Sequence, residues 1–480
     1  MKKPSPLPDY REALRLLDTF SNSESTLPPP AFFRDGRDRM RRLLERLGQP
    51  HLGIPAVHIA GTKGKGSVTH LAGAVLTAAG FKTGLYTSPH VENLRERIGL
   101  DGLPIGERAF SEAAAEVLPE ATAMREAGQA PSYFEVLTGI ALTAFRNAGV
   151  EAMFLETGLG GRLDATNIQD LRLAAAGLTS ISLDHEDILG HTLAEIAAEK
   201  AEIIRPGIPV ATAPQAEEVN RVIRTKASDC QAPLLTVGRE IRGEVRRRNQ
   251  PDKPEEGQRL EMAVRRQVYS DIPLALPGRH QAENATLALG LADLLLEYLD
   301  REPPGSLILK RAWRELTLPA RLEVVGRSPW RVVDGAHNPA AAWAAAETLG
   351  ECFTSRNATL VFGVAADKNW RLMLRILLPK FRQAVFTPFN SPRSLKTGEL
   401  SDFAAREFPG VGIQEAADPA QALDRAGNAT PREGLILVTG SLYLAGEALA
   451  VYRPGRNGQP AMVPNSEQFS LDPGSPRKSL

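Results

Sequence analysis

A short glycine-rich segment, Gly61-Thr-Lys-Gly-Lys-Gly-Ser67, contains the residue types that bind a polyphosphate. Its glycines allow a tight turn that directs successive backbone N–H groups toward an anion, and Lys65 adds a positive charge. The hydroxyl of Ser67 is suited to the Mg²⁺ ion that accompanies such a ligand. The common spacing G-x-x-x-x-G-K-[ST] is not met, because Gly66 separates Lys65 from Ser67. The segment therefore predicts a nucleoside triphosphate site of an unusual class.

The elements on either side of this segment are those that such a site requires. An apolar strand is predicted at Val57–Ala60, and a helical pattern runs from Ser67 to Ala79. A helix that begins at the loop turns the positive end of its dipole toward the bound anion. The strand–loop–helix order thus supports phosphate binding.

Polar residues also follow three other predicted strands in the same half of the chain: Glu156, His185 and Ser88. Ligands of open parallel sheets bind beyond the carboxyl ends of the strands, so these side chains should meet near Lys65. A carboxylate, an imidazole and a hydroxyl can hold a divalent ion. A capping acid, a structural histidine and a proline turn are the alternatives, and the shared position favours the metal site. The strands concerned are predicted at Thr83–Tyr86, Ala152–Leu155 and Ala175–Ser182.

The alternation of strands and helices predicts an α/β protein with two domains. We expect an N-terminal P-loop ATPase-like domain with a mostly parallel sheet at 1–317 and a C-terminal Rossmann-like α/β domain at 318–453. The segment from Pro233 to Leu276 predicts a small antiparallel sheet within the first domain. Residues 454–480 are polar and rich in Pro, Gly and Ser, which predicts a disordered tail.

Composition excludes several classes of partner. Acidic and basic residues are balanced at 57 each, so nucleic acid and anionic membranes are not expected partners. The N-terminal residues have no apolar core of a signal peptide, and no uncharged apolar stretch reaches the roughly 18 residues of a membrane span. Cys230 and Cys352 belong to no metal-type cluster. These features predict a cytoplasmic protein.

With these motifs in this order, the chain resembles the folylpolyglutamate synthase / dihydrofolate synthase family, a branch of the Mur-type ligases. The resemblance extends from Tyr10 to about Val451. Its most specific elements are GTKGKGS at 61–67, YTSPH at 86–90, ERI at 96–98, YFE at 133–135, ETGLGGRLDATN at 156–167, LDHEDILGHTLAEIAAEKA at 183–201, PGRHQAEN at 277–284, RLE at 321–323, DGAHNP at 334–339 and GSLYLAG at 440–446.

The resemblance implies roles for residues in both predicted domains. Nucleotide contacts are implied for Gly61, Thr62, Lys63, Gly64, Lys65, Gly66, Ser67, Asn284, Arg321, Asp334 and His337. Two Mg²⁺ sites are implied, with ligands from Ser67, Ser88, Glu156 and His185. Contacts with a pterin substrate are implied for Ser132, Phe134, Glu135, Leu163, Asp164 and Ala165. The catalytic group would comprise Lys65, Glu156, His185 and Lys200.

Two of the residues with implied roles, Lys200 and Lys63, affect the charge of the predicted site. Lys200 matches the lysine that is carbamylated in this family, a change that replaces a cation near the metal with an anion. Lys63 is a departure, because the family usually has asparagine at that position. Glu202-Ile-Ile-Arg205 also replaces the usual glycine and lysine. Lys63 either adds a cation to the triphosphate site or points to solvent.

The resemblance implies an ATP-dependent ligase, monomeric, that adds L-glutamate to a folate or dihydropteroate carboxylate. A carboxylate is a poor electrophile, so transfer of the γ-phosphoryl group of ATP would first convert it to an acyl phosphate. L-Glutamate would bind in the cleft between the domains, where Arg393 either pairs with its carboxylate or belongs to a surface turn. A Mur-type cell-wall amino-acid ligase and a non-catalytic nucleotide-binding paralogue are the alternatives. The choice between dihydropteroate and reduced folates stays open.

Overall fold

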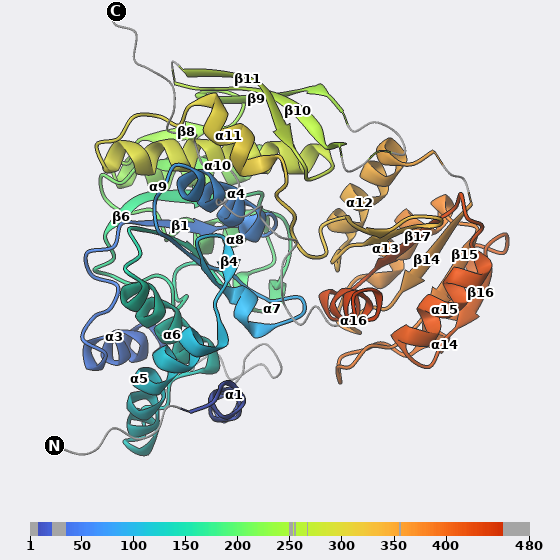
Figure 1. Cartoon of the computed structure of the whole chain (residues 1–480), viewed down its shortest axis with the longest axis horizontal. Coiled ribbons are helices and arrows are strands. Elements are labelled where there is room, and N and C mark those ends of the chain that lie inside the picture. The colour runs from blue at the N-terminus through green and yellow to red at the C-terminus, as the bar shows by residue number, and fades with distance from the viewer. Residues whose placement is uncertain are drawn as a thin grey trace, which may run out of the picture.

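The computed structural model describes residues 8–21, 35–248, 253, 256–265, 267–354 and 357–454. Two α/β domains lie side by side, with the C-terminal domain in orange and red (Figure 1). None of the helices within the described ranges is long and apolar enough to cross a membrane. The predicted fold class is confirmed, with a mostly parallel sheet in each domain.

The N-terminal domain is built on a sheet of eight described strands in the order β4-β3-β2-β5-β1-β6-β7-β8. The strands from β2 to β8 in this order are parallel, while β3 and β4 form an antiparallel edge. Because β1 is central, the loop that follows it lies where the direction of strand connection changes, the usual ligand position. The strands are β1 (Ala56–Ala60), β2 (Thr83–Tyr86), β3 (Ile98–Leu100), β4 (Leu103–Pro104), β5 (Ala152–Glu156), β6 (Leu173–Leu178), β7 (Val210–Thr212) and β8 (Leu234–Thr236).

Helices cover both faces of this sheet. Val57, Ile59 and Phe154 pack on the α4–α10 face, whereas Met153 and Leu155 pack with α5 and α6, as expected for alternating side chains of a strand. The helices are α1 (Tyr10–Leu17), α3 (Gly36–Arg46), α4 (Lys65–Ala78), η1 (Leu94–Arg97), α5 (Glu107–Glu126), α6 (Tyr133–Ala148), α7 (Glu186–Leu189), α8 (Leu193–Ala201), α9 (Glu217–Asp229), α10 (Arg279–Tyr298) and α11 (Ser306–Trp313).

The predicted small antiparallel sheet is present and lies beside α10 (Figure 1). It consists of β9 (Ile241–Arg247), β10 (Gln258–Val264) and β11 (Gln267–Leu274). The packing against α10 is close, since a Cβ on Gly243 would lie 2.0 Å from Thr286 Oγ1. The sheet therefore forms an outer layer of the N-terminal domain.

The C-terminal domain has a sheet of six described strands, β12-β13-β17-β14-β15-β16, parallel except for β12. The strands are β12 (Glu323–Gly326), β13 (Trp330–Val333), β14 (Ala358–Phe362), β15 (Gln383–Phe386), β16 (Gly412–Glu415) and β17 (Leu435–Thr439). The helices are α12 (Pro339–Cys352), α13 (Trp370–Leu377), η3 (Leu378–Lys380), α14 (Thr397–Glu407), α15 (Pro419–Ala429) and α16 (Leu442–Tyr452). The domain limits at 317/318 and 453 stay a prediction, and residues 455–480 of the predicted tail lie outside the described residues.

Several element ends differ from the sequence prediction. The strand predicted to run to Ser182 ends at Leu178, because the carbonyl of Ser180 accepts from the N–H groups of Thr62 and Lys63 instead. Helix α4 begins at Lys65, two residues before the predicted start, since Gly64 adopts the left-handed conformation of its N-cap. Both differences occur next to the phosphate-binding loop.

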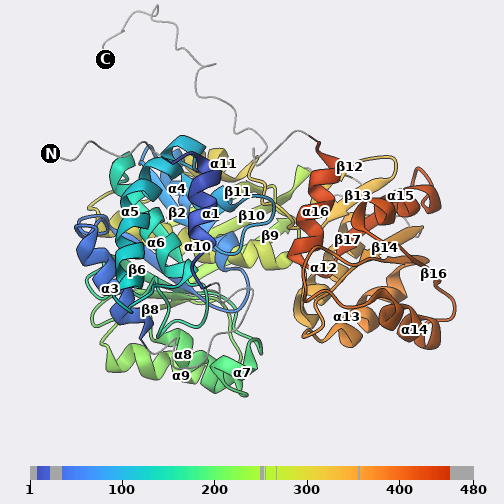
Figure 2. The same cartoon turned by 90° about the horizontal axis from the view of Figure 1, so that it is seen from below.

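The two domains touch through backbone as well as side chains. A Cβ on Gly446 of α16 would lie 2.1 Å from the carbonyl oxygen of Val91 in the N-terminal domain. Arg248 Nη1 also lies 2.9 Å from Glu351 Oε1 of α12. Figure 2 shows α12 and α16 as the elements that face the N-terminal domain.

Candidate active site

The phosphate-binding loop follows β1 and has two glycines that no other residue could replace without strain. Gly61 has φ +148°, and a Cβ there would lie 1.9 Å from Thr179 Oγ1. Gly64 has φ +86°, and a Cβ there would lie 2.5 Å from Asn284 Oδ1. A left-handed φ and a blocked Cβ position both select glycine. The second contact also places the predicted nucleotide residue Asn284 against the loop.

A second set of contacts fixes the loop to the segment after β6. Thr62 Oγ1 donates to the carbonyl oxygen of Ser182 at 3.0 Å and accepts from the Ser182 N–H at 3.1 Å. The Thr62 hydroxyl is thus occupied by hydrogen bonds within the protein, and its contact with a nucleotide stays a prediction. The two segments that carry Lys65 and His185 are held as one unit.

Glu156 stands at the end of β5, directly against the loop. Its carboxylate lies 3.8 Å from Lys65 Nζ and accepts the Ser88 N–H at 3.1 Å. A Cβ on Gly66 would lie 3.3 Å from Glu156 Oε2. The side chain is 4% exposed. Burial raises the pKa of Glu156, and the charge of Lys65 and the Ser88 N–H oppose that rise.

The residues predicted to hold Mg²⁺ fit that ion by the chemistry of their donor atoms. Glu156 offers a buried carboxylate, Ser67 is buried at the start of α4, and the backbone of Ser88 is bonded to Glu156. Mg²⁺ is usually held by one or two carboxylates together with substrate phosphates, so few protein ligands suffice. Accordingly, the described residues contain no cluster of three or more His, Cys, Asp or Glu side chains arranged around a metal position.

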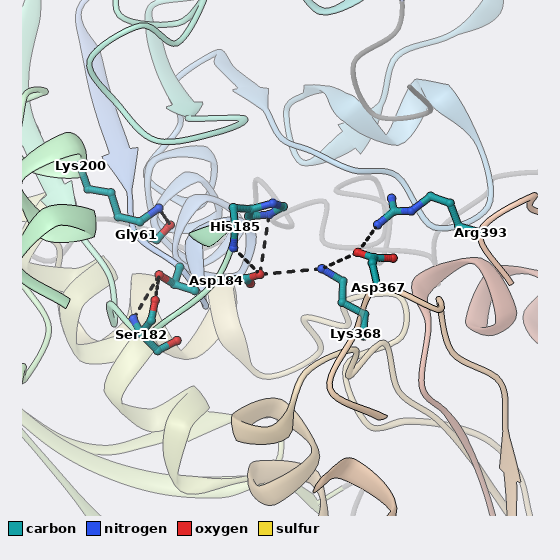
Figure 3. Close-up of polar contacts among 9 residues, drawn as sticks. Gly61, Ser182, Asp184, His185, Lys200, Asp367, Lys368 and Arg393 are labelled. Carbon is teal, nitrogen blue, oxygen red and sulfur yellow. Dashed lines mark hydrogen bonds and ion pairs between the residues drawn. The ribbon is translucent and has the colours of Figure 1, made fainter. Parts of the chain in front are cut away.

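His185 and Lys200 both lie close to the loop. His185 has a left-handed backbone at the start of α7, and its side chain is 50% exposed. Partial burial together with nearby lysines lowers its pKa to about 4, against the charge of Asp184. The imidazole is therefore neutral at pH 7, the form that binds a metal. Lys200 is buried, and its Nζ donates to the Gly61 carbonyl oxygen at 2.9 Å (Figure 3). Burial, followed by the charge of Lys65, lowers the pKa of Lys200 to about 7.

The residues predicted to contact a pterin lie around the start of α6 and the loop after β5. A Cβ on Gly158 would lie 2.7 Å from Phe134 Cζ, so the Phe134 ring packs on that loop. Ser132 and Glu135 form a capping box for α6. The Glu135 carboxylate also accepts from Arg39 Nε at 3.0 Å and from Arg39 Nη2 at 2.8 Å. Glu135 therefore fixes α3 against α6, and its substrate contact stays a prediction.

Asp164 likewise accepts hydrogen bonds within the protein. It accepts from the N–H of Leu159 at 2.8 Å and from the hydroxyl of Thr166 at 2.5 Å. Since that hydroxyl donates to Asp164, it accepts from His58 Nε2 at 2.8 Å. The buried chain from His58 through Thr166 to Asp164 sets the shape of the loop that carries Leu163 and Ala165. A direct contact of these residues with substrate stays a prediction.

The predicted nucleotide residues of the C-terminal domain meet at the ends of β12 and β13. Asp334 accepts from the N–H groups of Leu322 and Ala336, each at 2.9 Å. A Cβ on Gly335 would lie 3.1 Å from Arg321 Nη1. The positive charge of Arg321 lowers the pKa of Asp334 and also that of Glu156 in the other domain, both against the larger effect of burial. Arg321 thus acts electrostatically on carboxylates of both domains.

His337 lies beside this group. Its Nδ1 is 3.0 Å from the Gly335 carbonyl oxygen, which can only accept, so Nδ1 carries the proton and Nε2 is the free acceptor. Burial lowers the pKa of His337, and Lys368 and Asp184 also act on it, with opposite signs. The His337 imidazole therefore lies within the electrostatic reach of Asp184 and Lys368.

Arg393 belongs to a row of charged side chains that extends to Asp184 of the N-terminal domain. Its Nη2 donates to Asp367 Oδ2 at 2.7 Å, and Lys368 Nζ lies 3.7 Å from the same carboxylate and 3.8 Å from Asp184 Oδ1 (Figure 3). The sequence reasoning gave no role to Asp367 or Lys368. They lie in the loop after β14, at the same edge of their sheet that Glu156, at the end of β5, occupies in its own, so the strand-end rule applied to the second sheet would have found them.

Fold and site together define a two-domain ATP-dependent ligase of the Mur type. Residues 59–292 match the family model described as Mur ligase middle domain, and residues 320–442 match the model described as Mur ligase, glutamate ligase domain. The first match covers the phosphate-binding loop, Glu156, Lys200 and Asn284, and the second covers Arg321, Asp334 and His337.

Individual relatives narrow the assignment. The chain is 34% identical over 417 residues to the dihydrofolate synthase/folylpolyglutamate synthase of Bacillus subtilis, covering 85% of this chain and 93% of that protein. It is 35% identical over 417 residues to a probable bifunctional folylpolyglutamate synthase/dihydropteroate synthase of Haloferax volcanii, covering 86% of this chain and 48%, about half, of that protein. The structure of Mycobacterium tuberculosis folylpolyglutamate synthase complexed with ADP superimposes with a TM-score of 0.83 at 33% identity, covering 94% of this chain and 99% of that chain.

The chain belongs to the folylpolyglutamate synthase / dihydrofolate synthase family. The expected class of enzyme, an ATP-dependent ligase, is thereby confirmed.

Proposed function

We propose that this protein uses ATP to join L-glutamate to the carboxylate of a folate or dihydropteroate. The observation that carries the proposal is the buried Glu156 carboxylate, 3.8 Å from Lys65 of the phosphate-binding loop and within the electrostatic reach of Arg321 from the other domain. This arrangement supports a nucleotide site in the N-terminal domain that a residue of the C-terminal domain also reaches. The relatives' names supply the substrates.

The proposed reaction has two steps. A carboxylate oxygen of the pterin substrate attacks the γ-phosphorus of ATP, and the bond to ADP breaks. The glutamate amine then attacks the acyl carbon, inorganic phosphate leaves and a proton is released. Lys65 and the N–H groups at the start of α4 stabilise the charge on the transferred phosphoryl group.

Mg²⁺, held by Ser67, Ser88, Glu156 and His185, would supply further positive charge at the phosphates. The protein's own contribution is to hold the carboxylate, the imidazole and the loop in place before substrate binds. Asn284, Arg321 and Asp334 would hold the nucleotide from the far side, and His337 Nε2 would accept a hydrogen bond there. We also propose a second Mg²⁺ site beside Lys200.

Lys200 fits the carbamylation proposed for it. A lysine reacts with CO₂ only as a neutral amine, and burial lowers its pKa to about 7. The amine nitrogen bonds to the carbon of CO₂ and loses a proton, so the product is a carbamate anion. Its position, 2.9 Å from the Gly61 carbonyl, would bring that anion to the loop.

An ADP-release assay tests the proposed function. The enzyme, ATP and L-glutamate are combined with dihydropteroate or with tetrahydrofolate in separate reactions, and product mass is determined for each. ADP release that depends on both glutamate and a pterin is expected. ADP release with a muramoyl substrate instead would assign the protein to the cell-wall ligases. Nucleotide binding without ADP release on any substrate would indicate a non-catalytic paralogue.

The same proposal includes a monomer in the cytoplasm that binds neither nucleic acid nor membrane. The balanced charge of the chain supports the absence of polyanionic partners. Size-exclusion chromatography with light scattering tests the monomer directly.

A further inference from the structure

Lys368 connects the C-terminal domain to the segment that carries His185. It belongs to the loop after β14, and its Nζ lies 3.8 Å from Asp184 Oδ1 in the N-terminal domain. The Lys368 side chain is 18% exposed and that of Asp184 is 14% exposed. This ion pair is therefore largely shielded from water, unlike most ion pairs on the surface.

Asp184 in turn holds the turn that begins α7. Its Oδ1 accepts the N–H of His185 at 3.0 Å, so the atom that faces Lys368 also fixes the backbone of His185. Asp184 Oδ1 thus joins the backbone of the His185 turn to the ammonium group of Lys368.

Lys368 is itself held in place within its own domain. Asp367 Oδ2 lies 3.7 Å from Lys368 Nζ, and Arg393 donates to the same carboxylate at 2.7 Å. Figure 3 shows the resulting row of alternating charges, from Arg393 through Asp367 and Lys368 to Asp184. Because Lys368 lies between the carboxylates of Asp367 and Asp184, the row orients its side chain toward the N-terminal domain.

Lys63 of the phosphate-binding loop is a second cation near Asp184. The contacts between Thr62 and Ser182 bring the loop alongside this segment. Burial lowers the pKa of Lys63, and the negative charge of Asp184 opposes that change. The segment that Lys368 contacts therefore lies beside the phosphate-binding loop.

We propose that Lys368 is a positioning residue that holds the C-terminal domain against the His185 turn through Asp184. The ion pair fixes the loop after β14, to which Arg393 is joined through Asp367, beside the segment that contacts the phosphate-binding loop. The inference rests on the proposed function only for its kinetic readout.

The first test compares Lys368→Gln with Lys380→Gln, a matched control. Lys380 is a lysine of the same domain that pairs with Glu347 at 3.9 Å on the surface, and its side chain is 41% exposed. Lys368→Gln should lower kcat/KM for L-glutamate roughly fivefold to thirtyfold, the usual range for a coupled pair, and Lys368→Arg should restore most of it. Equal kinetics for Lys368→Gln and Lys380→Gln would overturn the proposal.

A double-mutant cycle tests whether Lys368 acts through Asp184. Asp184→Asn, Lys368→Gln and the double variant are compared, with thermal unfolding to check the fold of each. If the two residues act through one contact, the double variant should be no slower than the slower single variant. Additive losses would show that Lys368 acts elsewhere and would reject the assignment.

A third measurement needs no acceptor substrate, so it separates this inference from the proposed function. Small-angle X-ray scattering of the full chain, with and without the ATP analogue AMPPCP and Mg²⁺, reports the separation of the domains. Lys368→Gln should be less compact than the wild type and Lys380→Gln under both conditions, because only Lys368→Gln removes the ion pair with Asp184. The same scattering from all three proteins would contradict the positioning role even if the ligase reaction is confirmed.

Discussion

The two sides of the cleft are held by different kinds of contact. In the N-terminal domain, Glu156 and Lys200 are buried and bonded to backbone groups, so their positions are fixed before any ligand arrives. On the other side, the Arg393 side chain is 39% exposed and that of Asp367 is 50% exposed, and their main partners are each other. An exposed pair of this kind contributes up to about 1 kcal/mol, so Arg393 can exchange Asp367 for a substrate carboxylate.

The comparison indicates a division of tasks. The buried side suits the phosphoryl group, whose charge must be met by groups that do not rearrange during the reaction. The exposed side suits the amino acid, which has to enter and leave. Substitutions on the buried side should therefore affect kcat most, and those on the exposed side should affect KM for L-glutamate.

The largest effect is expected for Glu156→Gln. It removes the carboxylate next to Lys65 while keeping the size of the side chain, and kcat should fall about a thousandfold. ADP release under saturating substrates gives the value, and circular dichroism confirms the fold. Glu120→Gln, on the exposed surface, is the control. Wild-type kcat in Glu156→Gln would end the assignment of the buried side to phosphoryl transfer.

Gly64→Ala should weaken nucleotide binding about tenfold or more, because the added Cβ would lie 2.5 Å from Asn284 Oδ1. Gly53→Ala provides a matched control, since its φ of +84° is close to the +86° of Gly64 but nothing lies within 4 Å of its Cβ position. The control should lose about 1 kcal/mol of stability and bind ADP normally. Calorimetric titration with ADP separates the two, and equal affinities would show that the loop tolerates a shift.

Lys200 should give stability a distinctive dependence on pH. Its pKa is lowered to about 7 in the folded protein, while the unfolded chain keeps the ordinary value of 10.5. Between these values only the unfolded state binds the proton, so the unmodified lysine makes stability rise with pH by up to about 1.4 kcal/mol per unit.

Urea unfolding in CO₂-free buffer at pH 7.5 and 9.5 tests this dependence. The rise should be smaller in Lys200→Met than in the wild type. ¹³C NMR in labelled bicarbonate should show a carbamate signal in the wild type alone. The same slope in both proteins would contradict the buried, neutral amine.

The smallest effect is expected for Arg393→Gln, on the exposed side. KM for L-glutamate should rise about fivefold with kcat nearly unchanged, because an exposed ion pair is worth up to about 1 kcal/mol. Steady-state kinetics at varied L-glutamate gives both constants. A loss confined to kcat would remove the distinction between the two sides of the cleft.

The sequence was sufficient for the parts of the site that depend on neighbours along the chain. The loop from Gly61 to Ser67 and the position of Glu156 at the end of β5 follow from strand–loop–helix order, and both lie where the motifs predicted. The capping box of Ser132 and Glu135 is equally local and has a readable spacing. Local order is encoded in spacing, so it can be read without a structure.

Contacts between distant segments could not be read in this way. The bond from Arg39 to Glu135 and the ion pair of Lys368 with Asp184 depend on how helices and domains pack. Nothing in the spacing of these residues distinguishes them from solvated charges. Glu135 and Asp164 illustrate this limit of sequence-based prediction. A substrate contact was predicted for both, and the structure shows their carboxylates in hydrogen bonds within the protein.

The contact of Gly446 with Val91 has a mechanical consequence for the cleft. A carbonyl oxygen occupies the place where a Cβ would stand, so main chain presses on main chain and no rotamer can yield. Such a contact resists compression but not separation. The C-terminal domain can move outward from this contact, whereas inward movement ends there, and any side chain placed at Gly446 would hold the two domains farther apart.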